Sequence, residues 1–110
     1  MLAEFSSSNL TDANDLPAGG MVDGVGLSIQ WQSGPLGKEG VDRIEPNGAF
    51  VETLIAAALQ RIRWYQEVCG GKFRCMENTN AIAHLSDALR ALDQRTKNRE
   101  ARGVEGTHQE

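Results

Sequence analysis

The fold of this chain is decided by the stretch NGAFVETLIAAALQRIRWYQEV, residues 47–68, and by the glycine pair Gly70-Gly71 after it. Its apolar residues recur at intervals of three and four, the spacing of one face of an α-helix. We therefore expect a helix from about Gly48 to Val68, with Asn47 as the N-cap and Glu52 in the first turns. The expected apolar stripe consists of Val51, Leu54, Ile55, Ala58, Ile62 and Tyr65.

A second helix is expected from about Met76 to Arg99 or beyond. Gly103 lies where a glycine commonly ends a helix, at the position called C′. Because only a short turn joins the two helices, we expect them to run antiparallel. The apolar stripe of the second helix consists of Ile82, Leu85, Leu89 and Leu92.

The segment before the helices has the composition of strands and loops. Residues 25–32 alternate between apolar and small or polar side chains, which predicts a half-buried strand. Residues 22–26 either extend that strand or supply a partner across a glycine turn. Residues 33–47 are expected to form a loop, with room for a short second strand around residues 41–44. The fold class is then α+β, with short N-terminal antiparallel strands followed by two long antiparallel helices.

Residues 1–24 are rich in serine, aspartate, asparagine and glycine, which is typical of a disordered arm. The arm contains four carboxylates and no lysine or arginine, so it accounts for the whole formal charge of −4. We therefore expect a single α+β ligand-binding domain over residues 25–110. Its neutral balance disfavours general binding of DNA or RNA, which needs a wide basic surface.

Other features of the sequence indicate a cytoplasmic protein. No run approaches the roughly 20 apolar residues of a transmembrane helix, and residues 1–10 lack the pattern of a signal peptide. Cys69 and Cys75 are then expected to be reduced thiols. Their spacing is loose for a metal site, and two small half-buried residues on either side of a turn is the favoured interpretation. We expect no metal and no cofactor.

Two helices and one or two strands make a small core for a folded region of this size. Oligomerisation is the usual remedy, because a second copy can cover the apolar stripes that one copy leaves exposed. We therefore expect a dimer that forms through the helices, or a multiple of such a dimer.

The residue patterns give no support to catalysis. The stretch GPLGKEG resembles a phosphate loop but has Glu39 where that loop needs a hydroxyl. The serines outside the arm have no histidine and carboxylate at motif spacing. His84 and Asp87 are three residues apart on a helix, which is more typical of a surface pair than of a general base. We therefore expect that the protein is not an enzyme.

Binding of a phosphate-bearing ligand has better candidates. Arg95 and Arg99 are four residues apart on one helical face, where two guanidinium groups can bind a pyrophosphate. Cations at a helix C-terminus can equally well only complement the helix dipole. Asn78 can fix a base or a ribose hydroxyl, or it can be a simple first-turn residue. Tyr65 can stack on a purine or pack at the edge of the core.

Asn78 and Arg95 are too distant to share a ligand within one chain. They lie 17 residues apart on the second helix, which corresponds to about 25 Å. If two copies pack antiparallel, the start of one helix meets the end of the other. A twofold dimer would then have two equivalent composite sites.

Several motifs resemble those of the first described family of phage Thoeris anti-defence proteins. The resemblance covers about residues 25–108, and its C-terminal part is the most specific. The matching stretches are WQSGP at 31–35, GV at 40–41, RIRWYQ at 61–66, FRCMEN at 73–78 and QRTKNREARGVEGTH at 94–108.

The resemblance implies a protein that binds cyclic ADP-ribose isomers and holds them away from their effector without cleaving them. Some members of the family form trimers of dimers and also bind cyclic oligonucleotides. The motifs carry ligand-binding roles over to Tyr65, Asn78, Arg95 and Arg99. Where this chain has Tyr65 the family commonly has Phe, and a few residues lengthen the turn at 69–72. Two alternatives remain, a small helical adaptor protein without a nucleotide ligand and a nucleotide hydrolase.

Overall fold

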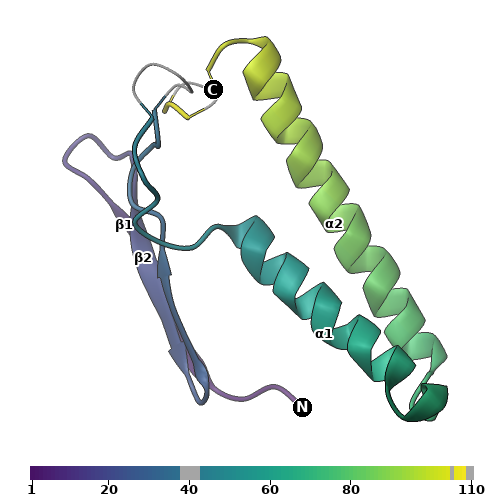
Figure 1. Cartoon of the computed structure of the whole chain (residues 1–110). Helices are drawn as coiled ribbons and strands as arrows, with labels where there is room; N and C mark the ends of the chain where they lie inside the picture. Colours follow the sequence, from purple (N-terminus) through teal and green to yellow (C-terminus); the bar gives the residue numbers. More distant parts are fainter. Residues whose placement is uncertain (38–42, 105, 109–110) are drawn as a thin grey trace. The chain divides into compact units, whose positions relative to one another are not determined.

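The computed structural model describes residues 1–37, 43–104 and 106–108. Three antiparallel strands precede two long helices, so the predicted α+β class is confirmed (Figure 1). The chain divides into two compact units, Met1–Phe50 with Arg99–Glu110, and Val51–Asn98. The elements are β1 (Phe5–Thr11), β2 (Pro17–Gly24), β3 (Leu27–Trp31), α1 (Val51–Gly71) and α2 (Met76–Ala101).

The first unit contains a three-stranded antiparallel sheet in the order β1-β2-β3. Phe5 pairs with Gly24 across β1 and β2, and Gly24 pairs with Leu27 across β2 and β3. Gly26, in the turn between β2 and β3, has a φ of 74°. Residues 22–24 therefore supply a partner for the predicted strand across a glycine turn, which was one of the two alternatives for this segment.

The predicted disordered arm is wrong for residues 5–11 and 17–24, which form β1 and β2. The cluster of aspartate and asparagine between them builds the turn of a hairpin. Asp12 Oδ1 accepts hydrogen bonds from the backbone N–H groups of Asn14 (2.8 Å) and Leu16 (3.1 Å). The hydrogen bonds from Leu16 and Asn14 lower the pKa of Asp12. Side-chain bonds of this kind are what favours aspartate in turns.

Gly20 shows why the paired glycines are compatible with a strand. Its φ is +144°, and a Cβ at this position would lie 2.1 Å from the carbonyl oxygen of Ser8 on β1. The residue therefore allows a close approach of two backbones, which requires glycine. Glycine in this segment suggested a flexible arm, but Gly20 is required for the pairing of β2 with β1.

The segment before α1 runs beside the end of β3. Ala49 N donates to Gln30 O (2.7 Å), and Gln32 N donates to Ala49 O (2.9 Å). Asn47 is not the N-cap of α1, because its side chain instead accepts from Ser33 N (2.8 Å) and donates to Ser33 O (3.1 Å). The helix begins four residues later, at Val51. The GV motif at residues 40–41 lies outside the described residues. So do residues 41 and 42 of the second strand that was expected at 41–44.

Both helices end close to where the sequence predicts. The helical geometry of α1 stops at Val68 (φ −62°, ψ 150°), although the element extends formally to Gly71. At the end of α2, Gly103 has a φ of 71°, and its N–H donates to Glu100 O (3.0 Å). Val104 N donates to Arg99 O (3.0 Å). These two bonds form a Schellman motif with Gly103 at C′, as expected.

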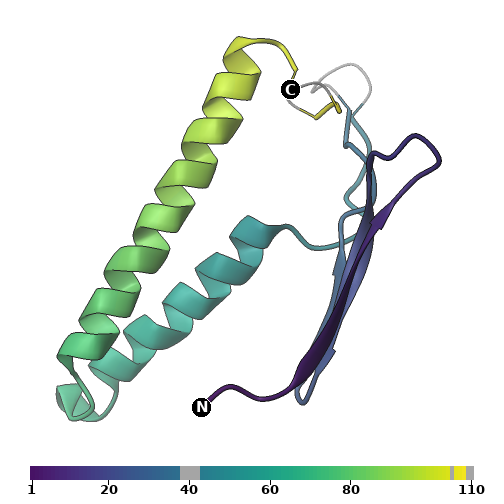
Figure 2. The ribbon, with the colours of Figure 1, turned by 180° about the vertical axis from the view of Figure 1, so that it is seen from behind.

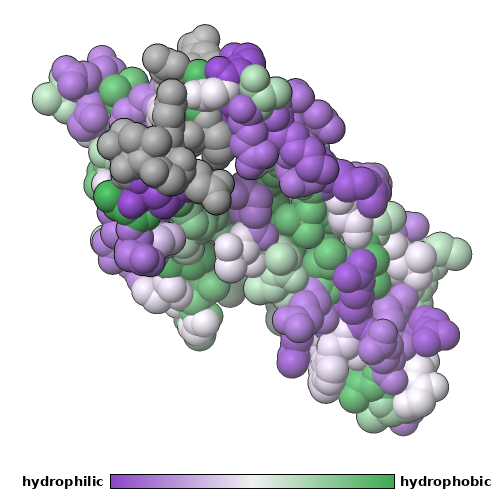
Figure 3. All heavy atoms as spheres, turned by 45° about the horizontal axis from the view of Figure 1, so that its top comes forward, coloured by the Kyte–Doolittle hydropathy of each residue, from purple (hydrophilic) through white to green (hydrophobic). Residues whose placement is uncertain are grey.

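The second unit is a helical hairpin (Figure 2). Little apolar surface is buried in it. Leu59 is the buried hydrophobic residue among those described, with 5% exposure. The less exposed apolar stripe of α1 contains Ile55, Leu59 and Ile62. The predicted stripe also included Val51 and Tyr65, which are exposed. The observed stripe is therefore rotated about the helix axis from the predicted one. Apolar residues are visible at the surface among polar ones in Figure 3. Neither described helix has an apolar stretch long enough to span a bilayer.

Candidate functional site

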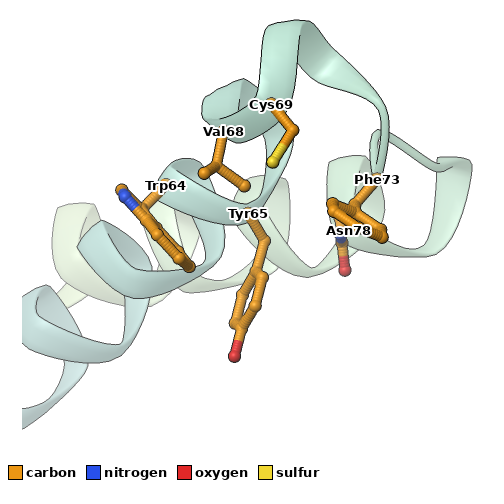
Figure 4. Close-up of a pocket in the computed structure, with 6 residues that line it drawn as sticks. All are labelled: Trp64, Tyr65, Val68, Cys69, Phe73 and Asn78. Atoms are coloured by element: carbon orange, nitrogen blue, oxygen red, sulfur yellow. The ribbon is translucent and has the colours of Figure 1, made fainter.

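A pocket lies at the turn that joins α1 to α2, within the unit Val51–Asn98. Its volume is about 390 Å³, and this is within the size range of small-molecule sites. Three of its six lining side chains are aromatic, and one amide contributes a polar group (Figure 4). The lining residues are Trp64, Tyr65, Val68, Cys69, Phe73 and Asn78.

Gln66 fixes the relative position of the two helix ends beside this pocket. It is 9% exposed, and its side-chain oxygen accepts hydrogen bonds from Cys75 N (3.0 Å) and Asn78 Nδ2 (3.4 Å). Its nitrogen donates to Thr79 Oγ1 (2.9 Å) and Cys75 O (3.3 Å). The buried amide is therefore satisfied on both sides, which avoids the penalty for an unpaired buried polar group.

The turn itself depends on residues with positive φ. Cys69 has a φ of 54° and Gly70 has a φ of 65°, so α1 stops abruptly and the chain reverses. Cys75 then caps α2, because its Sγ accepts a hydrogen bond from Asn78 N (3.4 Å). Both cysteines are free, Cys69 exposed and Cys75 half-buried. They lie on either side of the turn, as the sequence predicts, but the prediction that both are half-buried is wrong for Cys69.

Tyr65 and Asn78 are the two predicted ligand-binding residues that a single chain brings together. Tyr65 projects from the last turns of α1, and Asn78 is the third residue of α2. In Figure 4 the Tyr65 hydroxyl and the Asn78 side-chain oxygen point to the same side of the pocket. Tyr65 is 43% exposed, so its ring is accessible to a ligand. Asn78 also has the structural contact to Gln66, and the two interpretations of this residue are compatible.

The rings of Trp64 and Tyr65 meet edge to face, with centroids 5.1 Å apart and planes inclined by 65°. The Arg61 guanidinium lies over both of them, 4.4 Å from the centroid of Trp64 and 5.0 Å from that of Tyr65. On the opposite wall, Lys72 Nζ lies 5.6 Å from the centroid of Phe73. The pocket is thus aromatic and has cations against its rings, an arrangement that suits an aromatic ligand with negative charge.

The structure does not bring Arg95 and Arg99 to the Tyr65–Asn78 pocket within one chain. Arg95 is exposed and lies 17 residues after Asn78 on α2, about 25 Å along the helix. Arg99 is only 6% exposed, and its guanidinium donates to Val104 O (2.9 Å) and Thr107 O (2.8 Å). A composite site from two copies remains a prediction.

Sequence reasoning missed three contributors to the pocket region. Arg61 and Gln66 were noticed only as parts of a motif, and Phe73 was given no role. The spacing of Arg61 from the two aromatic residues, three and four positions, could have indicated the stacked arrangement. The bonds of Gln66 join residues of different helices, so no local pattern points to them.

No protein-family model matches the chain. The chain is similar to a curated protein named Thoeris anti-defense 1, from Bacillus phage SBSphiJ7, with 40% identity over 82 residues. The match covers 74% of this chain and 52% of that protein, so the chain spans about half the length of the curated relative it matches. The similarity confirms the predicted resemblance to the Thoeris anti-defence family.

Proposed function

Because this chain is a homologue of a Thoeris anti-defence protein, we propose that it binds and sequesters a cyclic nucleotide immune signal. The signal is a cyclic ADP-ribose isomer, as the family resemblance implies. The protein holds it without cleaving it, in the cytoplasm of the infected host. An effector that depends on the signal is then deprived of it.

The observation that supports this proposal most is the shared pocket of Tyr65 and Asn78. An adenine that stacks on the exposed Tyr65 ring gains about 1–3 kcal/mol. The Asn78 amide can bond to a base edge or a ribose hydroxyl, since it offers both a donor and an acceptor. The apolar wall beside these groups excludes water from the bound base.

A second copy completes the site in this proposal. Exposed apolar residues on α1, such as Val51 (49%) and Leu54 (38%), favour burial against another chain. In an antiparallel pair, Arg95 of one copy reaches the pocket of the other and binds the pyrophosphate. Arg99 joins it when its guanidinium exchanges the bonds to Val104 O and Thr107 O for bonds to phosphate. The functional form is a homodimer or a trimer of such dimers, with no membrane and no nucleic-acid polymer as partner.

Calorimetric titration with cyclic ADP-ribose isomers tests the proposal. We expect saturable heat with one isomer and one site per chain, and the same isomer recovered intact when the complex is denatured. Recovery of a hydrolysed product would indicate an enzyme instead. The absence of heat with every isomer would contradict sequestration and favour an adaptor.

A further inference from the structure

We propose that Arg61 binds a phosphate group of the nucleotide in the Tyr65–Asn78 pocket. The inference rests on the proposed function, since it assumes that the pocket takes a nucleotide. It adds a cation that comes from the same chain as Tyr65. The pyrophosphate would then be bound from two directions, by Arg61 and by arginines of the partner copy.

The position of Arg61 on α1 places its charge beside the aromatic wall. Trp64 and Tyr65 follow it by three and four residues, so all three side chains lie on one side of the helix. The guanidinium covers the two rings at 4.4 and 5.0 Å from their centroids. Arg61 is exposed and lies beside the lining residues rather than among them. In this proposal, a base that stacks on Tyr65 has its attached phosphates within reach of this charge.

Stacking leaves the hydrogen-bonding capacity of Arg61 available. A guanidinium stacks through its face, while its five N–H groups point outward in its plane. The same side chain can therefore contact the rings and donate two parallel hydrogen bonds to a phosphate. Lysine offers no such planar pair of donors, so Lys72 on the other wall can contribute only a point charge.

Within residues 1–37, 43–104 and 106–108, no carboxylate forms an ion pair with this guanidinium. The residues three and four positions from Arg61 on α1 are Ala57, Ala58, Trp64 and Tyr65, so none is acidic. The ion pairs between described residues lie on α2, Arg90 with Asp87 and Lys97 with Asp93.

Arg95 and Arg99, the arginines named from the family motifs, are placed differently from Arg61. Arg99 uses its guanidinium for the carbonyl oxygens of Val104 and Thr107. Arg95 lies about 25 Å along α2 from Asn78. In the part of the chain that the structure describes, Arg61 is the arginine whose guanidinium lies over rings of the pocket.

The Arg61→Met variant tests the assignment, because methionine keeps most of the apolar contact with the rings and removes the charge. Arg63→Met is the matched control, since Arg63 is exposed on the same helix and the charge change is identical. Affinity for the cyclic ADP-ribose isomer that binds the wild type is measured by calorimetry. The ³¹P spectrum is recorded for each complex at saturating ligand.

We expect Arg61→Met to weaken binding about ten- to a hundredfold, from charge-assisted bonds of about 1.5–3 kcal/mol. At least one ³¹P resonance of the bound ligand should shift, and Arg63→Met should change neither quantity. Binding by Arg61→Met within twofold of the wild type overturns the inference. A loss of affinity with unchanged ³¹P resonances also overturns it, because Arg61 would then only position the rings. If the wild type binds no isomer, the proposed function fails together with this inference.

Discussion

Asn78 Nδ2 donates a hydrogen bond to Gln66 Oε1 at 3.4 Å, so the last turns of α1 orient a side chain in the first turn of α2. The same oxygen accepts from Cys75 N, which begins the capping of α2. One buried amide thus controls both the start of the second helix and the polar group of the pocket. Because little apolar surface is buried in the hairpin, this contact is one of the constraints that hold the pocket in shape.

Gln66→Met should destabilise the hairpin. Methionine is similar in size to glutamine but has no amide, so the Cys75 N–H loses its partner. The expected loss in the free energy of unfolding is about 1–3 kcal/mol. Thermal unfolding followed by circular dichroism measures it. Gln60→Met, at an exposed position of the same helix, serves as the control and should leave the midpoint unchanged. Equal midpoints for the two variants would mean that Gln66 does not hold the turn.

Arg99→Ala should lower stability, whereas Arg95→Ala should not. Arg99 is buried and bonds to two carbonyl oxygens that follow the helix end, while Arg95 is exposed. Bonds that involve a charged group contribute about 1.5–3 kcal/mol. If both arginines only complement the helix dipole, each substitution should cost no more than about 0.3–1 kcal/mol. A comparison of the two unfolding curves decides between these outcomes, and an Arg99→Ala variant as stable as Arg95→Ala would support the helix-dipole interpretation.

Hydrogen exchange should show protection of the backbone amides in the β1–β2 hairpin. Gly20→Ala should reduce that protection, because the new Cβ would lie 2.1 Å from Ser8 O. Ser7→Ala, at an exposed position of β1, should leave it in place. Rapid exchange throughout residues 5–24 of the wild type would instead support the disordered arm.

The sequence predicted the helices well because helical periodicity and end signals are local. Gly103 at C′ and the stop at Val68 required only neighbouring residues. The N-terminal sheet was missed because the same residue types serve turns, close backbone approaches and disorder. Gly20 is distinguishable from a flexible glycine only when the backbone of Ser8 is placed beside it.

The sequence predicted only part of the candidate site, because the remaining contacts join residues that are distant in the sequence. Tyr65 and Asn78 were named from motifs, and the structure places both at one pocket. The role of Gln66 depends on bonds across the turn between the helices. The burial of Arg99 depends on how the chain folds back after Gly103. Neither of these tertiary contacts leaves a pattern in the local sequence.

The central claim is that one chain supplies Tyr65 and Asn78 while its partner supplies Arg95 to the same nucleotide. A mixed dimer of an Asn78→Ala chain and an Arg95→Ala chain, titrated with the cyclic ADP-ribose isomer that binds the wild type, tests it most directly. Both lesions then fall in one site and the other site remains intact. We expect half the wild-type number of sites, each with wild-type affinity. A mixed dimer in which all sites are equally weakened would contradict the two-chain site.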